Sequence, residues 1–162
     1  MVFISKNFNE LTTTELYEIL KSRAEVFLLE QKIICQDLDD VDYKSRHYFL
    51  QENNRVIAYL RVFYNDGDNS AVQMGRVLTL KHGCGFGAEL MKKSIADIKK
   101  NYKCSKICLH SQKYAAGFYE KFGFKVVSGD FLEEGIVHVS MELELRWIKK
   151  ELFDKSSFFG TI

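Results

Sequence analysis

The chain has 162 residues and a formal net charge of +1, and 46% of its residues are hydrophobic and 14% aromatic. This length and composition predict one domain with its own core and exclude an intrinsically disordered chain. With no basic stripe, no apolar run near the ~20 residues of a membrane helix and no signal peptide, we expect a cytoplasmic protein without a nucleic-acid or membrane partner.

The first half of the chain predicts a helix followed by antiparallel strands. Thr12 and Glu15 form a capping box at the start of the helix, and its apolar spacing continues to about Leu29. Short polar turns separate the β-rich runs that follow, which is typical of hairpins. The expected elements are a strand over 2–8, this helix, an acidic loop over 30–42, and strands over 47–51, 55–64 and 71–80.

The second half predicts two further helices, a long amphipathic one over Gly85–Asn101 and a short one over Tyr114–Phe122 that Gly123 ends. Strands are expected over 106–109 and 124–127, and strict period-two spacing predicts a last strand from Val137 to Trp147. This mixed order with several hairpins predicts an α/β (α+β) fold and not a regular βαβ array.

We expect one domain over residues 1–147 and an aromatic tail over 148–162. The end of the chain carries Trp147, Phe153, Phe158 and Phe159, too much apolar surface to leave in water. These rings could cover the chain's own sheet or a twofold-related subunit. Because symmetric dimers are the commonest oligomers, a homodimer is the expected outcome.

A glycine run, Gly83, Gly85 and Gly87, lies between a strand and the long helix. Such a turn lets backbone approach a ligand, and the helix N-terminus then favours phosphate. No Gly-Lys-Ser/Thr follows, which excludes a P-loop. Gly83, Gly85 and Ala88 match a dinucleotide pattern, but the next strand ends at Ser111 without the acidic residue that holds a ribose. A turn without any ligand remains an alternative.

Two segments resemble the GNAT N-acyltransferase superfamily. His82–Ala88 is similar to its pyrophosphate loop, R/Q-x-x-G-x-G/A, although His82 replaces the usual Arg or Gln. Ala116–Phe124 is similar to its F/L-Y-E-K-x-G-F segment, one helix and one strand further on. The resemblance covers about residues 2–143, and four segments narrow it to the ElaA-like branch. These segments are 23–31, 36–39, 75–77 and 135–141, with Ile34-Cys35 departing from the branch's usual Pro-Tyr.

The resemblance implies a GNAT-type fold with a central mixed, mostly antiparallel twisted sheet flanked by helices. It implies an N-acetyltransferase that moves an acetyl group from acetyl-CoA to a small-molecule amine or peptide amine. The alternative is a non-catalytic acyl-CoA-binding or sensing protein. The residues implied to bind acetyl-CoA are Val77, Leu78, Thr79, Gly83, Cys84, Gly85, Phe86, Gly87 and Ala88.

The same resemblance implies that Tyr119 stabilises the leaving thiolate. A hydrogen bond fits this role better than full proton donation, because a phenol pKa near ~10 lies above a thiol pKa near ~8.5. Gly75 is expected to mark a bulge that frees a backbone N–H to polarise the thioester carbonyl. The strand over 71–80 has no Asp or Glu, so the candidate bases are His110 and Glu30, with His138 and Asp37 as further candidates.

No spacing of cysteines or histidines predicts a metal site. The four cysteines, at positions 35, 84, 104 and 108, include no C-x-x-C pair. We therefore expect reduced, mostly buried thiols and a reaction without a metal.

Overall fold

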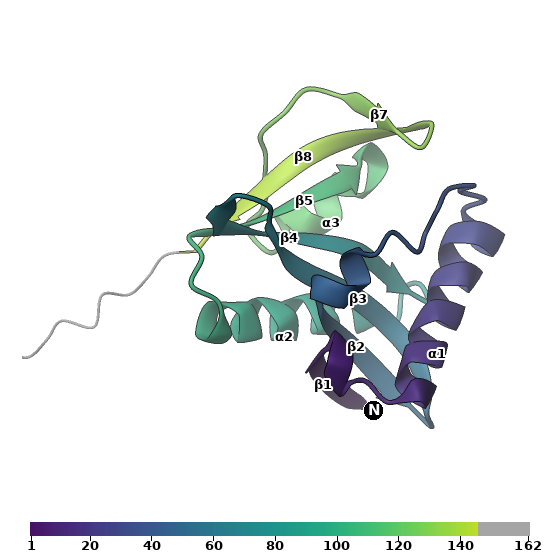
Figure 1. Ribbon diagram of the computed structural model, residues 1–162. Coiled ribbons are helices and arrows are strands. Elements are labelled where there is room, and N and C mark those ends of the chain that lie inside the picture. Colours follow the sequence, from purple (N-terminus) through teal and green to yellow (C-terminus); the bar gives the residue numbers. More distant parts are fainter. Residues whose placement is uncertain (146–162) are drawn as a thin grey trace, which may run out of the picture.

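An open sheet of eight strands runs through the part of the chain that the computed structural model describes, residues 1–145 (Figure 1). Its order is β1-β2-β3-β4-β5-β8-β6, with β7 pairing to β8 off this path. Among these described strands only β4 and β5 pair in parallel, so the predicted mixed, mostly antiparallel sheet is confirmed. The strands are β1 (Val2–Asn7), β2 (Arg46–Glu52), β3 (Arg55–Asn65), β4 (Asp68–Thr79), β5 (Lys106–Gln112), β6 (Lys125–Val126), β7 (Phe131–Glu133) and β8 (Ile136–Glu144).

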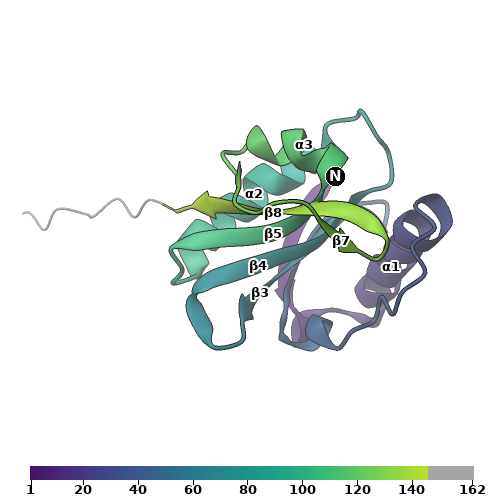
Figure 2. The same ribbon diagram turned by 90° about the horizontal axis from the view of Figure 1, so that it is seen from above.

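Helices cover both faces of the sheet (Figure 2). Alternate residues of β2 and β3 point to opposite faces, as the pleat requires. Tyr48 and Leu60 belong to a core cluster with α2 and α3, whereas Phe49 and Tyr59 belong to a second cluster with α1. The helices are α1 (Thr13–Arg23), the π-helix Ala24–Glu30 that continues it, α2 (Phe86–Asn101) and α3 (Ala116–Glu120), with 3₁₀ turns at Phe8–Glu10, Val41–Lys44 and Lys113–Ala115.

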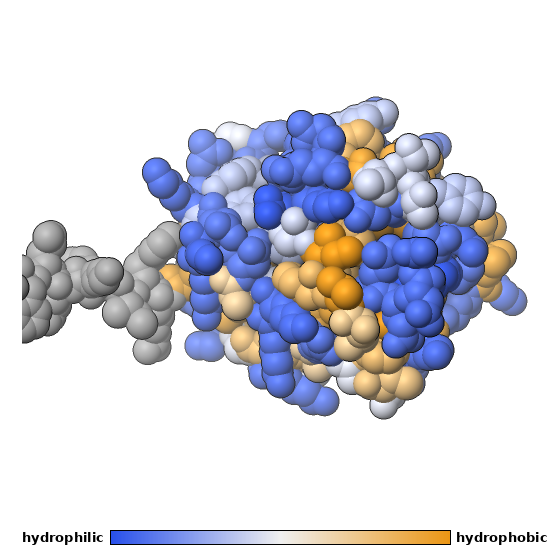
Figure 3. All heavy atoms as spheres, turned by 90° about the horizontal axis from the view of Figure 1, so that it is seen from below, coloured by the Kyte–Doolittle hydropathy of each residue, from blue (hydrophilic) through white to orange (hydrophobic). Residues whose placement is uncertain are grey.

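Helix α2 follows its predicted amphipathic pattern. Leu90, Met91, Ile95 and Ile98 are buried against the sheet, while its lysines lie in solvent. The face of the molecule seen from below is mostly hydrophilic, around a small hydrophobic area near its centre (Figure 3). Within residues 1–145, no helix has the length and apolar character needed to cross a membrane.

Several of the predicted elements differ from the structure in geometry or length, and short elements were missed. The helix predicted over Tyr114–Phe122 is a 3₁₀ turn over Lys113–Ala115 followed by α3 over Ala116–Glu120. The first helix changes from α to π geometry after Arg23, whereas one continuous α-helix to Leu29 was predicted. The last strand ends at Glu144, and Trp147 and the tail over 148–162 lie outside the described residues, as does the dimer prediction that rests on them. Strand β7 was not predicted, because three residues are too few to show a period.

The start of α1 provides a stability test. The Thr12 side chain accepts a hydrogen bond from the Glu15 backbone N–H at 3.1 Å, and the Thr12 N–H donates to Glu15 Oε2 at 2.8 Å. Thr12→Ala removes the side-chain half of this box and is expected to lower the free energy of unfolding by about 1 kcal/mol. Urea unfolding followed by circular dichroism measures the change. Thr14→Ala, at the exposed second residue of the same helix, is the control, and equal losses in both variants would contradict the capping role.

Candidate functional site

The parallel strands β4 and β5 separate part of the way along their length. They pair only from Ala71 opposite Lys106 to Met74 opposite Leu109. Beyond this point β5 continues on β8, with Gln112 opposite His138, while β4 continues on β3. The two halves of the sheet therefore open into a wedge, and the β5-facing edge of the last part of β4 lacks a strand partner among the described residues.

A β-bulge lies in β4 where the wedge begins. Tyr59 pairs with Leu78 and Arg61 with Gly75, so β4 has one more residue than β3 in this interval. The irregular backbone conformation of the bulge is that of Arg76, whose φ of 55° is in the left-handed region that few non-glycine residues adopt. The predicted bulge is thus present next to Gly75. Such a bulge turns backbone groups of a strand away from the regular ladder.

Paired charges hold Arg76 in this conformation. Its Nε donates to Asp37 Oδ1 at 2.8 Å, and its Nη2 lies 3.2 Å from Asp39 Oδ2. The same two aspartates reach two buried arginines. Arg23 Nε donates to Asp37 Oδ2 at 2.9 Å, and Arg61 Nη2 donates to Asp39 Oδ2 at 2.6 Å. The acidic loop is therefore fixed against β3 and β4 and forms one wall of the wedge.

Asp42 completes this network from the end of the loop. It is buried and accepts from Arg23 Nη1 at 2.8 Å and from Arg61 Nη1 at 2.9 Å. Burial alone would raise the pKa of Asp39, but the hydrogen bonds and charge of Arg61 hold that pKa at about 2, below its usual 3.8. Because the pKa of Asp39 is lower in the folded than in the unfolded chain, its ionised form stabilises the folded state. This contribution is complete well above the unfolded value of 3.8 and is lost as the pH falls towards about 2.

The glycine loop lies between the end of β4 and the start of α2. Gly83 and Gly85 have φ values of 74° and 79°, which L-residues with side chains rarely adopt, and a Cβ at either position would meet only open space. Gly85 is the N-cap of α2 and offers no side chain to the first backbone N–H groups of that helix. The first backbone N–H groups of α2 are therefore left without a side-chain cap, a geometry suited to binding an anion.

Gly87 has a different role, which is internal packing. A Cβ there would come within 3.3 Å of both the Phe118 ring and the Thr79 methyl group. The missing side chain lets the first turn of α2 approach the end of β4 and helix α3. This contact places the glycine loop beside the segment that contains Tyr119.

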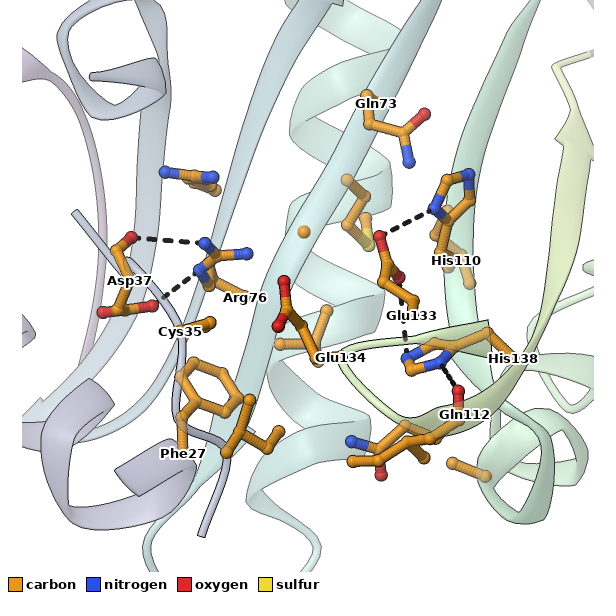
Figure 4. A pocket seen from close by; sticks show the side chains of 18 of the residues that line it. Phe27, Cys35, Asp37, Gln73, Arg76, His110, Gln112, Glu133, Glu134 and His138 are labelled. Carbon is orange, nitrogen blue, oxygen red and sulfur yellow. Dashed lines mark hydrogen bonds and ion pairs between the residues drawn. The ribbon is translucent and has the colours of Figure 1, made fainter. Parts of the chain in front are cut away.

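A cleft of about 870 Å³ occupies the wedge (Figure 4). The bulge residues Gly75, Arg76 and Val77 line it, as does Tyr119, which is 9% exposed. The Tyr119 ring packs edge-on against Phe118 and Phe124. Burial, with a smaller contribution from neighbouring Tyr114, raises the pKa of Tyr119 above its usual 10.0, so its hydroxyl stays protonated near neutral pH.

The opposite wall of the cleft carries histidines and carboxylates. His110 lies on β5 and His138 on β8, and both line the cleft (Figure 4). Glu133 lies between them, with Oε1 3.4 Å from His110 Nδ1 and Oε2 3.6 Å from His138 Nε2. Glu134 also faces the cleft from the turn between β7 and β8. The structure therefore brings the predicted His110 together with His138 and with two carboxylates that were not predicted.

Glu30, the other predicted base, lies beside the glycine loop and not in the described lining of the cleft. It ends the π-helix, and its Oε1 lies 2.8 Å from His82 Nε2. Both side chains are well exposed. His82, the residue that replaces Arg or Gln at the start of the loop, thus connects the loop to the end of the first helix.

Two of the four cysteines are exposed, so the prediction of mostly buried thiols is wrong. Cys84 lies exposed in the glycine loop and Cys35 at the acidic wall of the cleft, while Cys104 is buried and Cys108 partly buried. All four are free thiols. Over residues 1–145, no three His, Cys, Asp or Glu side chains gather in an arrangement that could hold a metal ion.

The missed carboxylates had a local signal in the sequence. Glu134 and Gly135 separate two short β-rich runs, and both adopt left-handed backbone, with φ values of 50° and 74°. A two-residue X-Gly turn between such runs is typical of a tight hairpin. A tight hairpin at this turn pairs Glu133 with Ile136 at the start of β8.

Comparison with known proteins shows extended similarity. The family model of an acetyltransferase (GNAT) domain matches residues 15–145. A UPF0039 protein of Schizosaccharomyces pombe is 37% identical over 147 residues, which cover 88% of this chain and 97% of that protein. The protein ElaA of Escherichia coli is 32% identical over 141 residues, which cover 85% of this chain and 92% of ElaA.

Solved structures agree with these sequence matches. The crystal structure of Escherichia coli ElaA superposes with a TM-score of 0.82 at 30% identity, and covers 88% of this chain and 99% of that one. An acyl-CoA N-acyltransferase from Pseudomonas aeruginosa superposes with a TM-score of 0.81 at 28% identity, with the same two coverages of 88% and 99%.

Proposed function

Since the chain belongs to the GNAT acetyltransferase family, in its ElaA-like branch, we propose that it transfers an acetyl group from acetyl-CoA to a primary amine. The family supports an acyltransferase in general, and the acetyl group and the amine are the finer parts of the proposal. The observation that carries the proposal is the wedge between β4 and β5, with the glycine loop at its end and Tyr119 in its lining.

The glycine loop fits the pyrophosphate of coenzyme A. We propose that backbone N–H groups of Gly83, Cys84, Gly85, Phe86, Gly87 and Ala88 hold it, because this loop and the first turn of α2 offer donors without side-chain caps. The pantetheine arm would then extend along Val77, Leu78 and Thr79 at the free edge of β4. The open space at Gly83 and Gly85 supports this placement.

Two groups are suited to act on the thioester. A backbone N–H at the bulge beside Val77 would polarise its carbonyl oxygen. The buried, protonated hydroxyl of Tyr119 would donate a hydrogen bond to the sulfur as negative charge develops there. No metal is needed for either step.

The proton of the amine needs an acceptor. Of the four candidate bases that the sequence predicts, His110, His138 and Asp37 line the cleft, whereas Glu30 pairs with His82 beside the glycine loop. The surroundings of His110 therefore favour the β5 and β8 side of the cleft as the place where the amine loses its proton. Glu30 stays a predicted alternative.

The charge of the cleft bears on the acceptor. Its lining includes the carboxylates Asp37, Asp39, Glu133 and Glu134 but only two guanidinium groups, Arg61 and Arg76. Both guanidinium groups are already paired with aspartates. We therefore propose a cationic small-molecule amine or peptide amine as acceptor.

We also propose that the chain works in the cytoplasm, because free thiols persist in a reducing compartment.

A panel of amines tests the proposed function. The full chain is incubated with acetyl-CoA and with diamines, polyamines, amino sugars, amino acids or short peptides, and thiol release is followed. We expect release to exceed the acetyl-CoA background for at least one cationic amine. Binding of acetyl-CoA without release for any amine would instead favour the alternative function, a non-catalytic acyl-CoA sensor.

A further inference from the structure

We propose that His138 is the base that removes the proton from the attacking amine, and that Glu133 is the residue that positions and stabilises it. The inference rests on the proposed function. It is carried by the hydrogen bond between His138 Nδ1 and the Ile136 carbonyl, which fixes the ring nitrogen that holds the hydrogen. It is also carried by the β7–β8 hairpin, which places a carboxylate near the other ring nitrogen.

The Ile136 carbonyl determines the tautomer of His138. Its oxygen lies 2.8 Å from His138 Nδ1, and a carbonyl oxygen can only accept a hydrogen bond. The hydrogen of the neutral imidazole therefore lies on Nδ1, and Nε2 keeps its lone pair. His138 is 8% exposed and lines the cleft, so Nε2 belongs to a buried and oriented side chain (Figure 4).

The hairpin supplies the counter-charge. Phe131 lies directly opposite His138 in the register of β7 and β8, and its ring stacks on the imidazole with centroids 6.0 Å apart. Two residues on, Glu133 places Oε2 at 3.6 Å from His138 Nε2. A carboxylate at this position stabilises the imidazolium that forms when Nε2 takes a proton. His138 is thus oriented through Nδ1 by a backbone carbonyl and charge-balanced beside Nε2 by a carboxylate.

His110 shares the carboxylate but is not oriented in the same way. Its Nδ1 lies 3.4 Å from Glu133 Oε1, and its side chain is 46% exposed. Within residues 1–145 no backbone carbonyl is bonded to either of its ring nitrogens, so its tautomer depends on the longer contact with the Glu133 carboxylate alone. The other charged or titratable groups of the cleft are Glu134 at the hairpin tip, Tyr114 and Tyr119 beside β5, and Cys35, Asp37, Asp39, Arg61 and Arg76 on the far wall.

The proposed step conserves atoms and charge. The lone pair of the neutral amine forms a bond to the thioester carbonyl carbon as the C=O π pair moves to oxygen, and an N–H proton of that amine passes to His138 Nε2. The oxygen pair then re-forms the C=O bond. The C–S bond then breaks and its electron pair stays on sulfur, which accepts a hydrogen bond from Tyr119. The imidazolium of His138 returns its proton to the thiolate or to water, and the base is regenerated.

Matched variants separate the two histidines. His138→Asn keeps a donor that can reach the Ile136 carbonyl but removes the base, and it is expected to lower kcat by about 100-fold or more. His110→Asn is the comparison and is expected to lower kcat far less, by about tenfold at most, because it removes a neighbour of Glu133 and not the base. Circular dichroism and acetyl-CoA binding, both unchanged in each variant, show that the fold and the cosubstrate site persist.

A pH profile tests Glu133, because a merely structural role would not move it. In Glu133→Gln the imidazolium loses its counter-charge, so the limb where kcat/KM falls on acidification is expected to move to lower pH, with a lower plateau. Glu134→Gln, at the neighbouring carboxylate that contacts neither histidine, is expected to leave the limb in place. An unmoved limb in Glu133→Gln would overturn the positioning role.

Nitrogen NMR of the imidazoles gives a readout that needs no acceptor. Long-range proton–nitrogen correlation is expected to show the neutral His138 ring protonated on Nδ1, and protonation on Nε2 would overturn the inference. Full turnover in His138→Asn, or loss of turnover in His110→Asn alone, would overturn the role of His138 and leave the proposed function standing. Absence of turnover in the wild type with every amine would overturn both.

Discussion

Replacing Gly85 with valine is expected to weaken acetyl-CoA binding by about 100-fold or more while the fold persists. Gly85 is the N-cap of α2 at a φ of 79°, a conformation that a β-branched side chain does not adopt without strain. The loop must change its backbone to accept valine, and the N–H groups then no longer converge on one anion. Loss of two charge-assisted hydrogen bonds, each worth about 1.5–3 kcal/mol, corresponds to this change in affinity.

Gly67 provides the matched control. It has a φ of 82° in the turn between β3 and β4, and a Cβ there would also meet open space. Gly67→Val therefore carries the same kind of backbone strain away from the glycine loop and is expected to bind acetyl-CoA like the wild type. Isothermal titration calorimetry measures both variants. Equal affinity in Gly85→Val and the wild type would show that the loop does not hold the cosubstrate.

Removing only the hydroxyl of Tyr119 is expected to lower kcat by about 100-fold, with little change in acetyl-CoA affinity. Phenylalanine keeps the edge-on packing against Phe118 and Phe124, so the fold has no reason to change. The lost group is a protonated hydroxyl inside the cleft, and its hydrogen bond to sulfur would form only as the thiolate leaves. An interaction made only in the transition state affects kcat and not ground-state binding.

Tyr114→Phe is the control for this variant. Tyr114 also lines the cleft but is 79% exposed, and its hydroxyl has no proposed part in the chemistry. Single-turnover kinetics with a productive amine observe the chemical step without product release. A wild-type rate in Tyr119→Phe, or equal losses in both variants, would contradict the role of Tyr119.

Features set by neighbouring residues could be predicted from the sequence. The capping box of Thr12 and Glu15 needs only a spacing of three residues, and the structure contains both of its hydrogen bonds. The glycine loop and the amphipathic face of α2 are equally local signals. Gly75 correctly indicated the bulge, although the left-handed residue is Arg76, held there by the carboxylates of Asp37 and Asp39.

Pairings between distant residues could not be predicted in the same way. The acidic loop has the composition of a solvated segment, but Asp37 and Asp42 pair with Arg23, which lies 14 and 19 residues earlier in the chain. Nothing local in the sequence shows that these charges meet. The contact between Glu133 and the two histidines likewise depends on the register of β7 on β8 and of β8 on β5. The wall of the cleft that bears on acceptor choice was therefore the least predictable part.

The fate of the acetyl group tests the central claim most directly. The full chain is incubated with acetyl-CoA that carries a heavy isotope in its acetyl group and with the amine that gives the fastest thiol release, and the products are identified by mass spectrometry. Our account predicts the labelled acetyl group on the nitrogen of that amine, with free coenzyme A in equal amount. A label that stays on coenzyme A, or that is found only in acetate, would contradict it.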